Sequence, residues 1–99
     1  MNMQQMLMQA QKMQRELQKA QDQLKVKEFT VSKGGAITVI VTGDRKVKSI
    51  SVDPDAFDKD NKEMVEEMIA MAINEAIEQI DAESVAINEQ ITGRSSGLF

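Results

Sequence analysis

Hydrophobic and polar residues follow one another along the first quarter of the chain with the spacing of a helix. The apolar residues of this segment recur every three or four positions, at Met3, Met6, Ala10, Met13, Leu17, Ala20 and Leu24. This heptad spacing predicts a long helix over residues 1–26. Such a helix extends about 35 Å at ~1.5 Å per residue, which is too long for one small core to cover. We therefore expect a partner helix to pack along its outer part.

Residues 27–53 show the patterns of β-strands. Three short runs rich in β-branched residues are separated by turn-favouring residues at Lys33-Gly34-Gly35 and at Gly43-Asp44-Arg45-Lys46. The middle run, Ala36 to Thr42, is almost continuously apolar, which is typical of a strand covered on both faces. In the third run strict alternation places Ile50 and Val52 on one face beside Lys48. We predict a three-stranded antiparallel β-meander.

A second helix is predicted over residues 60–91. Pro54 ends the last strand before it, because proline cannot donate a hydrogen bond to a sheet. The apolar stripe of this helix is wide enough for two partners, which we expect to be the sheet and another helix. Ser84 occupies a seam position, so the sequence leaves open whether the helix is continuous or broken near residues 81–84. Residues 92–99 predict a flexible tail.

Together these patterns predict one domain, residues 1–99, of the α+β class: a long N-terminal helix, a three-stranded antiparallel β-meander and a long C-terminal helix, possibly broken. A single chain of 99 residues buries a modest core. Dimerisation is a common way to enlarge such a core.

Composition excludes several classes of function. The chain has no Cys and no His, so it lacks thiolate nucleophiles, thiolate metal sites and the usual general base near neutral pH. We expect no enzyme, no cofactor, no metal and no small-molecule substrate. No apolar run is long enough to cross a membrane. The first residues do not resemble a signal peptide, and we expect a cytoplasmic protein.

Charge is distributed unevenly along the chain. The net charge is −4, yet residues 1–49 contain nine Lys and Arg against four Asp and Glu, a net charge of +5. Residues 50–99 contain three and twelve, a net charge of −9. Any anionic partner should therefore meet the N-terminal half.

Acidic residues gather where the second helix is expected to begin. Asp53, Asp55, Asp58 and Asp60 suggest a cation loop, but the positions that such a loop needs for an oxygen ligand and a glycine are filled by other residues. Helix capping is the better interpretation. Gly34-Gly35 precedes a strand and lacks the rest of a phosphate-binding motif, so a hairpin turn explains it.

Basic residues are the most informative set. Lys12, Arg15 and Lys19 lie on the side of the first helix away from the heptad seam, and Lys25 and Lys27 follow. Such a face can bind phosphates, and it can equally be an ordinary solvated surface. Spacing alone does not decide between these two interpretations.

Three local motifs resemble one family. Gln9-Ala10-Gln11-Lys12-Met13-Gln14 is similar to its opening-helix signature. The stretch from Gly34-Gly35 to Asp53-Pro54 is similar to its conserved strand region, and Met68 to Ala76 to its later helix. In this order and spacing they resemble the YbaB/EbfC family of bacterial nucleoid-associated proteins.

The resemblance implies a homodimer with projecting helical arms, which binds double-stranded DNA and affects chromosome organisation and gene expression in the bacterial nucleoid. We expect little sequence specificity, with Lys12, Arg15, Lys19, Lys25 and Lys27 neutralising phosphates. The chain departs from the family in its acidic charge and in a second helix without Lys or Arg between Lys62 and Arg94. The alternative is a dimeric protein-interaction module whose arms clasp a protein partner.

Overall fold

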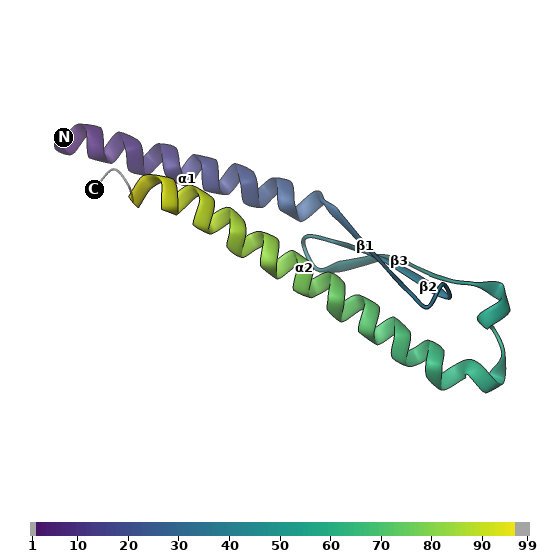
Figure 1. Ribbon diagram of the computed structural model, residues 1–99. Helices are drawn as coiled ribbons and strands as arrows, with labels where there is room; N and C mark the ends of the chain where they lie inside the picture. The colour runs from purple at the N-terminus through teal and green to yellow at the C-terminus, as the bar shows by residue number, and fades with distance from the viewer. Residues whose placement is uncertain (1, 97–99) are drawn as a thin grey trace.

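Two long helices and a small sheet form an elongated molecule of 69 × 19 × 15 Å (Figure 1). A computed structural model describes residues 2–96, with side chains up to residue 93. The elements in chain order are α1 (Met3–Val26), β1 (Glu28–Lys33), β2 (Ile37–Thr42), β3 (Lys46–Val52), the 3-10 turns η1 (Pro54–Ala56) and η2 (Lys59–Asn61), and α2 (Lys62–Ser96). The predicted α+β class and the order of its elements are confirmed.

Helix α1 begins with a capping box and packs against α2. The Asn2 side chain accepts a hydrogen bond from the Gln5 backbone N–H at 2.8 Å, and the Gln5 side chain accepts one from Asn2 N–H at 3.4 Å. The helix runs antiparallel beside the last part of α2 (Figure 1), so the expected partner helix belongs to the same chain. Leu24, at the inner end of the seam, is 5% exposed, whereas Met3 is 85% exposed. The seam is therefore covered only along its inner part.

The sheet packs one face against the first half of α2. The strand order is β1-β2-β3, and both pairings are antiparallel. On β2 the side chains of Ile37, Val39 and Val41 are fully buried in a cluster that includes Ala72 and Ala76 of α2. Small side chains on α2 let the helix approach the sheet closely.

The expectation that both faces of the central strand are covered is wrong for the single chain. Residues on the other face of β2, including Thr38 and Ile40, are only half-buried. No described helix packs on that face, and the neighbouring strands supply its partial cover.

A bulge changes the faces of β3. Ile50 pairs with Val39, but Val47 pairs with Val41, so the register shifts between these two pairs. Val47 therefore lies on the same face as Ile50, although their spacing is odd. Lys48 instead makes an ion pair with Glu28 across the sheet. The strict alternation expected from the sequence, with Lys48 beside Ile50, is thus wrong at this point.

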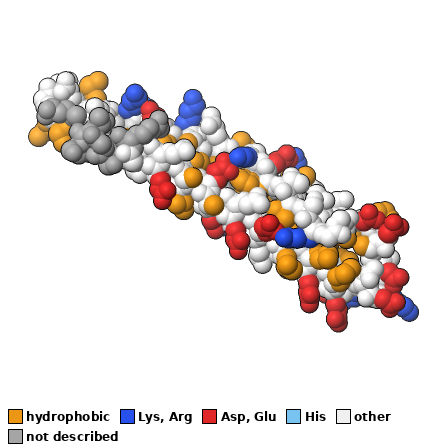
Figure 2. Space-filling view, viewed as in Figure 1, with side chains coloured by type: hydrophobic (Ala, Val, Ile, Leu, Met, Phe, Trp, Pro, Cys, Tyr) orange, Lys and Arg blue, Asp and Glu red, His pale blue; other side chains and the backbone are white. Residues whose placement is uncertain are grey.

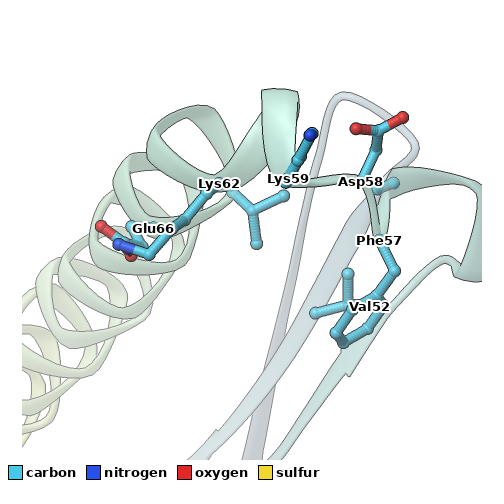
Figure 3. A pocket seen from close by; sticks show the side chains of 8 residues that line it. Val52, Phe57, Asp58, Lys59, Lys62 and Glu66 are labelled. Atoms are coloured by element: carbon cyan, nitrogen blue, oxygen red, sulfur yellow. Dashed lines mark ion pairs between the residues drawn. The ribbon is translucent and has the colours of Figure 1, made fainter.

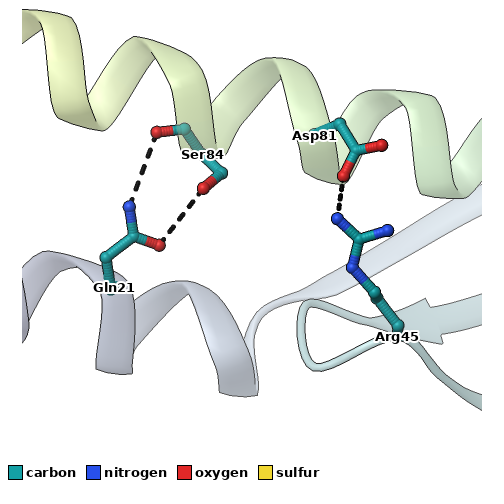
Figure 4. A network of polar contacts seen from close by, with 4 residues as sticks. All are labelled: Gln21, Arg45, Asp81 and Ser84. Carbon is teal, nitrogen blue, oxygen red and sulfur yellow. Dashed lines mark hydrogen bonds and ion pairs between the residues drawn. The ribbon is translucent and has the colours of Figure 1, made fainter.

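Helix α2 is continuous over 35 residues, which answers the question left open by the sequence. The segment around residues 81–84 is held by partners on other elements. Gln21 of α1 donates to the Ser84 carbonyl at 3.5 Å and accepts from the Ser84 hydroxyl at 3.3 Å, and Arg45 pairs with Asp81 (Figure 4). The polar Ser84 therefore faces a polar partner instead of breaking the helix.

The prediction of a flexible tail over residues 92–99 is wrong for residues 92–96. Helix α2 continues to Ser96, while residues 97–99 lie outside the described part of the chain. Ile91 is buried, and it lines a hollow between the helices together with Ala20 of α1. Packing against α1 stabilises this last part of the helix, and this tertiary effect outweighs the local preference of Gly93 for a turn.

The acidic residues before α2 cap short turns, as expected. The Asp53 side chain accepts from the Asp55 N–H at 2.8 Å, and the Asp58 side chain accepts from the Asp60 N–H at 2.9 Å. These two carboxylates fix the 3-10 turns that lead from β3 into α2.

Candidate nucleic-acid interface

The outer face of α1 carries a row of exposed cations. Lys12, Arg15 and Lys19 are all exposed, and they are separated by about 4.5 and about 6 Å along the helix axis. Within the described residues no ion pair joins any of the three to a carboxylate. Three positive charges are therefore available to a phosphate backbone on one face.

The first half of α1 contains no carboxylate. Residues 2–15 include Lys12 and Arg15 and no Asp or Glu, and the first acidic side chain is Glu16. The positive end of the helix dipole lies at the same end. This part of the molecule is the most favourable for an anionic partner, although the whole chain is acidic.

Lys25 and Lys27 differ from the other three predicted residues. The Lys25 ammonium lies 3.6 Å from Asp22, and both side chains are largely exposed. Lys27 lies 2.7 Å from Glu83 of α2, and its ammonium also stands 5.3 Å from the centre of the Phe29 ring. Exposed ion pairs of this kind contribute about 1 kcal/mol or less, so a phosphate can compete for these cations at a cost. Among the described residues, the predicted set thus divides into three cations without an ion pair, called the free cations below, and two that are paired.

Cations of the sheet are neutralised by α2 or by neighbours. Lys33 pairs with Glu75 and Arg45 with Asp81, each joining the sheet region to α2. Sequence analysis missed these contacts and the Lys27–Glu83 pair, whose partners are 56 positions apart. No local pattern reveals a pair so distant in the chain, because only the fold brings its two members together.

The charges separate visibly on the surface. Figure 2 shows most of the visible Lys and Arg side chains on the α1 edge, with a few carboxylates among them, and a row of Asp and Glu side chains along the α2 edge. A polyanion would therefore be attracted to one edge of the molecule and repelled from the other.

The two titratable groups with shifted pKa values are not among the predicted DNA-contact residues. A hydrogen bond from the Thr42 hydroxyl, helped by Lys46, lowers the pKa of Asp44. A hydrogen bond and the charge of Glu66 raise the pKa of Lys62. Both groups are at the surface, and each is explained by its immediate neighbour.

The described residues hold neither a membrane-spanning helix nor a metal-binding cluster. None of the described helices is long and apolar enough to cross a membrane. Among residues 2–93 no group of three potential ligands is arranged to hold a metal ion.

The chain is similar to known proteins over its whole length. The sequence model of the YbaB/EbfC DNA-binding family matches residues 1–95. A nucleoid-associated protein of Clostridium novyi is 40% identical, over 100% of this chain and 90% of the relative. One from Ruminiclostridium cellulolyticum is 40% identical over 98% of this chain and 85% of the relative. One from Chloroflexus aurantiacus is 39% identical over the full length of both.

These matches confirm the resemblance stated from the three sequence motifs, since both the family match and the relatives cover nearly every residue described above. The chain belongs to the YbaB/EbfC DNA-binding family, and it is not an enzyme.

Proposed function

We propose that this chain is a nucleoid-associated protein that binds duplex DNA as a homodimer with little sequence preference. The observation that carries the proposal is a row of cations on α1, Lys12, Arg15 and Lys19, which form no ion pair with the described side chains. They stand out in an otherwise acidic member of a DNA-binding family. These three residues make the principal phosphate contacts. Lys25 and Lys27 contribute less, because they must first leave Asp22 and Glu83. Relatives named nucleoid-associated proteins support an association with the nucleoid. From DNA binding there we expect an effect on chromosome organisation and gene expression.

The weak sequence preference follows from the chemistry of the contacts. Lys and Arg on a helix surface bind phosphate oxygens, which are the same at every base pair. The chain has no Trp or Tyr with which to stack on bases. Electrostatic attraction thus supplies most of the affinity.

Competition between duplexes tests this proposal. A labelled random-sequence duplex bound to the protein should be displaced with similar efficiency by unlabelled duplexes of equal length and different sequence. The expected spread of inhibition constants is within about tenfold, well below the ~10³ or more typical of specific readers. Displacement by one sequence alone would contradict the proposal.

An uncovered apolar surface supports the dimer. Helix α2 lies over β1 and β2 and leaves β3 largely uncovered, although Val47 and Ile50 point to the same face as the core. Both side chains are 45% exposed. β3 is also an edge strand, with hydrogen-bonding groups open to another strand. A second copy that covers β3 would bury the apolar side chains and pair the edge.

The same surface continues to the turn after β3. Phe57 is 79% exposed, and its ring stands beside Val52 next to a hollow of about 370 Å³ (Figure 3). Lys62 and Glu66 of α2 border this hollow and pair with each other. A large aromatic side chain left in water beside an apolar hollow favours a contact between subunits.

We expect Ile50→Lys to weaken the dimer by at least about tenfold, because it places a charge in an apolar interface. Sedimentation velocity at several protein concentrations measures the change. Ser49→Lys is the matched control, since Ser49 is exposed and pairs with Ile40 on the opposite face. If Ile50→Lys remained as dimeric as the Ser49→Lys control, the β3 surface would not be the interface.

A further inference from the structure

The outer side of α2 carries a continuous line of exposed residues that the fold leaves unused. Its members recur at helical spacing on the side of α2 away from the buried Ala72 and Ala76. This line, called the acidic stripe below, consists of Met64, Glu67, Met71, Glu78, Val85 and Glu89. Carboxylates and apolar side chains alternate along it, and Figure 2 shows this mixture on the α2 edge.

The carboxylates of the acidic stripe differ from most of the others on α2. Within the described residues Glu67, Glu78 and Glu89 take part in no ion pair, whereas Glu66, Glu75, Asp81 and Glu83 each have a cationic partner. The apolar members are exposed as well, with Met71 and Val85 at 58% and 54%. Apolar side chains that recur in one line with unpaired carboxylates form a surface for a cationic, partly apolar partner.

A matching line runs along the outer side of α1. Met8 and Val26, 61% and 77% exposed, lie in the same helical row as the three free cations. This line, called the basic stripe below, consists of Met8, Lys12, Arg15, Lys19 and Val26. Both stripes are straight helix surfaces, of about 27 and about 37 Å at ~1.5 Å per residue. They are complementary in charge, and both carry exposed apolar residues.

The two stripes cannot meet within one chain. α1 and α2 bury their inner sides against each other, as the Gln21–Ser84 contact shows, so the outer sides face in opposite directions. A contact between the stripes therefore joins two copies. Because the two surfaces differ, the contact is head-to-tail and can repeat from one dimer to the next.

We propose that the basic stripe of one copy docks on the acidic stripe of another, so that self-association and DNA compete for Lys12, Arg15 and Lys19. The competition rests on the proposed DNA-binding function, whereas the docking itself does not. Each exposed ion pair is weak, so the assembly is loose and salt-sensitive. DNA has a denser line of charge and displaces the acidic stripe.

Charge reversal tests the docking. The basic-stripe variant is Lys12→Glu with Lys19→Glu, and the acidic-stripe variant is Glu67→Lys with Glu78→Lys. Sedimentation velocity at low salt should show the wild-type protein associating beyond the dimer, with each variant associating at least about tenfold more weakly. An equimolar mixture of the two variants should recover the association, because an intact basic stripe then meets an intact acidic stripe.

Asp55→Lys with Asp60→Lys is the control. It changes the net charge by the same amount as the acidic-stripe variant, but both residues lie in the turns before α2. It should associate like the wild type. A wild-type protein that stays dimeric at low salt, or an acidic-stripe variant that associates as well as this control, would overturn the proposal. Failure of the mixture to recover association would overturn it as well.

Measurements of DNA binding distinguish a failure of the docking from a failure of the proposed function. The acidic-stripe variant should keep or increase its affinity for a labelled duplex, and duplex added to wild-type assemblies should dissolve them. The protein could assemble and yet show no DNA binding, so that duplex does not dissolve its assemblies. That result would contradict the proposed function but not the docking. Strong DNA binding by a protein that never assembles would contradict the docking alone.

Discussion

We expect Lys12→Glu with Lys19→Glu to lower the affinity for duplex DNA by at least about 100-fold. In a dimer this change removes four of the six free cations on the arms and adds four negative charges. Each lost phosphate contact also removes the entropy gained from one released counterion. Fluorescence anisotropy of a labelled random-sequence duplex measures the loss.

The matched control reverses two cations at the other end of the molecule. Lys59→Glu with Lys62→Glu changes the net charge equally at the turn before α2, remote from α1 (Figure 1). Both residues border the Phe57 hollow, so sedimentation velocity must first show that this variant is as dimeric as the wild type. We expect this variant to lose affinity only modestly through long-range repulsion. If the two double variants lost affinity equally, net charge and not the α1 face would determine binding.

We expect Gly43→Ala to destabilise the fold by about 3 kcal/mol or more. A Cβ atom at Gly43 would stand 1.8 Å from the Leu24 carbonyl oxygen and 2.6 Å from its carbon. The backbone cannot simply move away, because Gly43 N–H donates to the Lys27 carbonyl at 2.9 Å and Asp44 N–H to the Lys25 carbonyl at 3.2 Å. Thermal unfolding should show a melting temperature lower by more than about 10 °C.

Gly93→Ala controls for the substitution itself. Gly93 lies in α2, and none of the described residues comes within 4 Å of a methyl group added there. Alanine also favours a helix over glycine by up to about 1 kcal/mol, and this variant should be as stable as the wild type or slightly more so. A Gly43→Ala protein with an unchanged melting temperature would show that the end of α1 does not pack tightly on the β2–β3 turn.

Gly43 illustrates what local sequence can and cannot predict. The segment Gly43 to Lys46 was predicted as a turn, and the turn is present. The left-handed backbone conformation in this turn belongs to Arg45, with φ of 67°, and not to the glycine. Gly43 is needed instead because the end of α1 lies against it. That requirement arises from tertiary packing, and the turn preferences of neighbouring residues carry no information about it.

Helix boundaries also depend on both local sequence preference and tertiary packing. The heptad spacing of α1 predicted its helix, because periodicity is a property of neighbouring residues. The continuation of α2 through Ser84 and up to Ser96 depends on contacts with α1, made by Gln21 and by Ile91. Local preference pointed to a tail, and packing against a distant element outweighed it.

The candidate interface was predictable in part. Helical spacing placed Lys12, Arg15 and Lys19 on one face, and they lie there. It could not show that Glu83 holds Lys27, because this pair depends on how α2 folds back along the molecule. From the sequence, all five cations are predicted alike as phosphate contacts. The ion pairs of Lys25 and Lys27 favour the other three as the principal contacts.

The salt dependence of DNA binding tests the central claim most directly. A labelled random-sequence duplex is titrated with the wild-type protein at several salt concentrations, and log K is plotted against log[salt]. If Lys12, Arg15 and Lys19 of both arms neutralise about six phosphates, the slope should be near −5, whereas all five predicted cations would give a slope near −9. A slope near −5 supports the α1 face as the DNA contact. No binding even at low salt would contradict the account, and it would favour the alternative of a dimeric module whose arms clasp a protein.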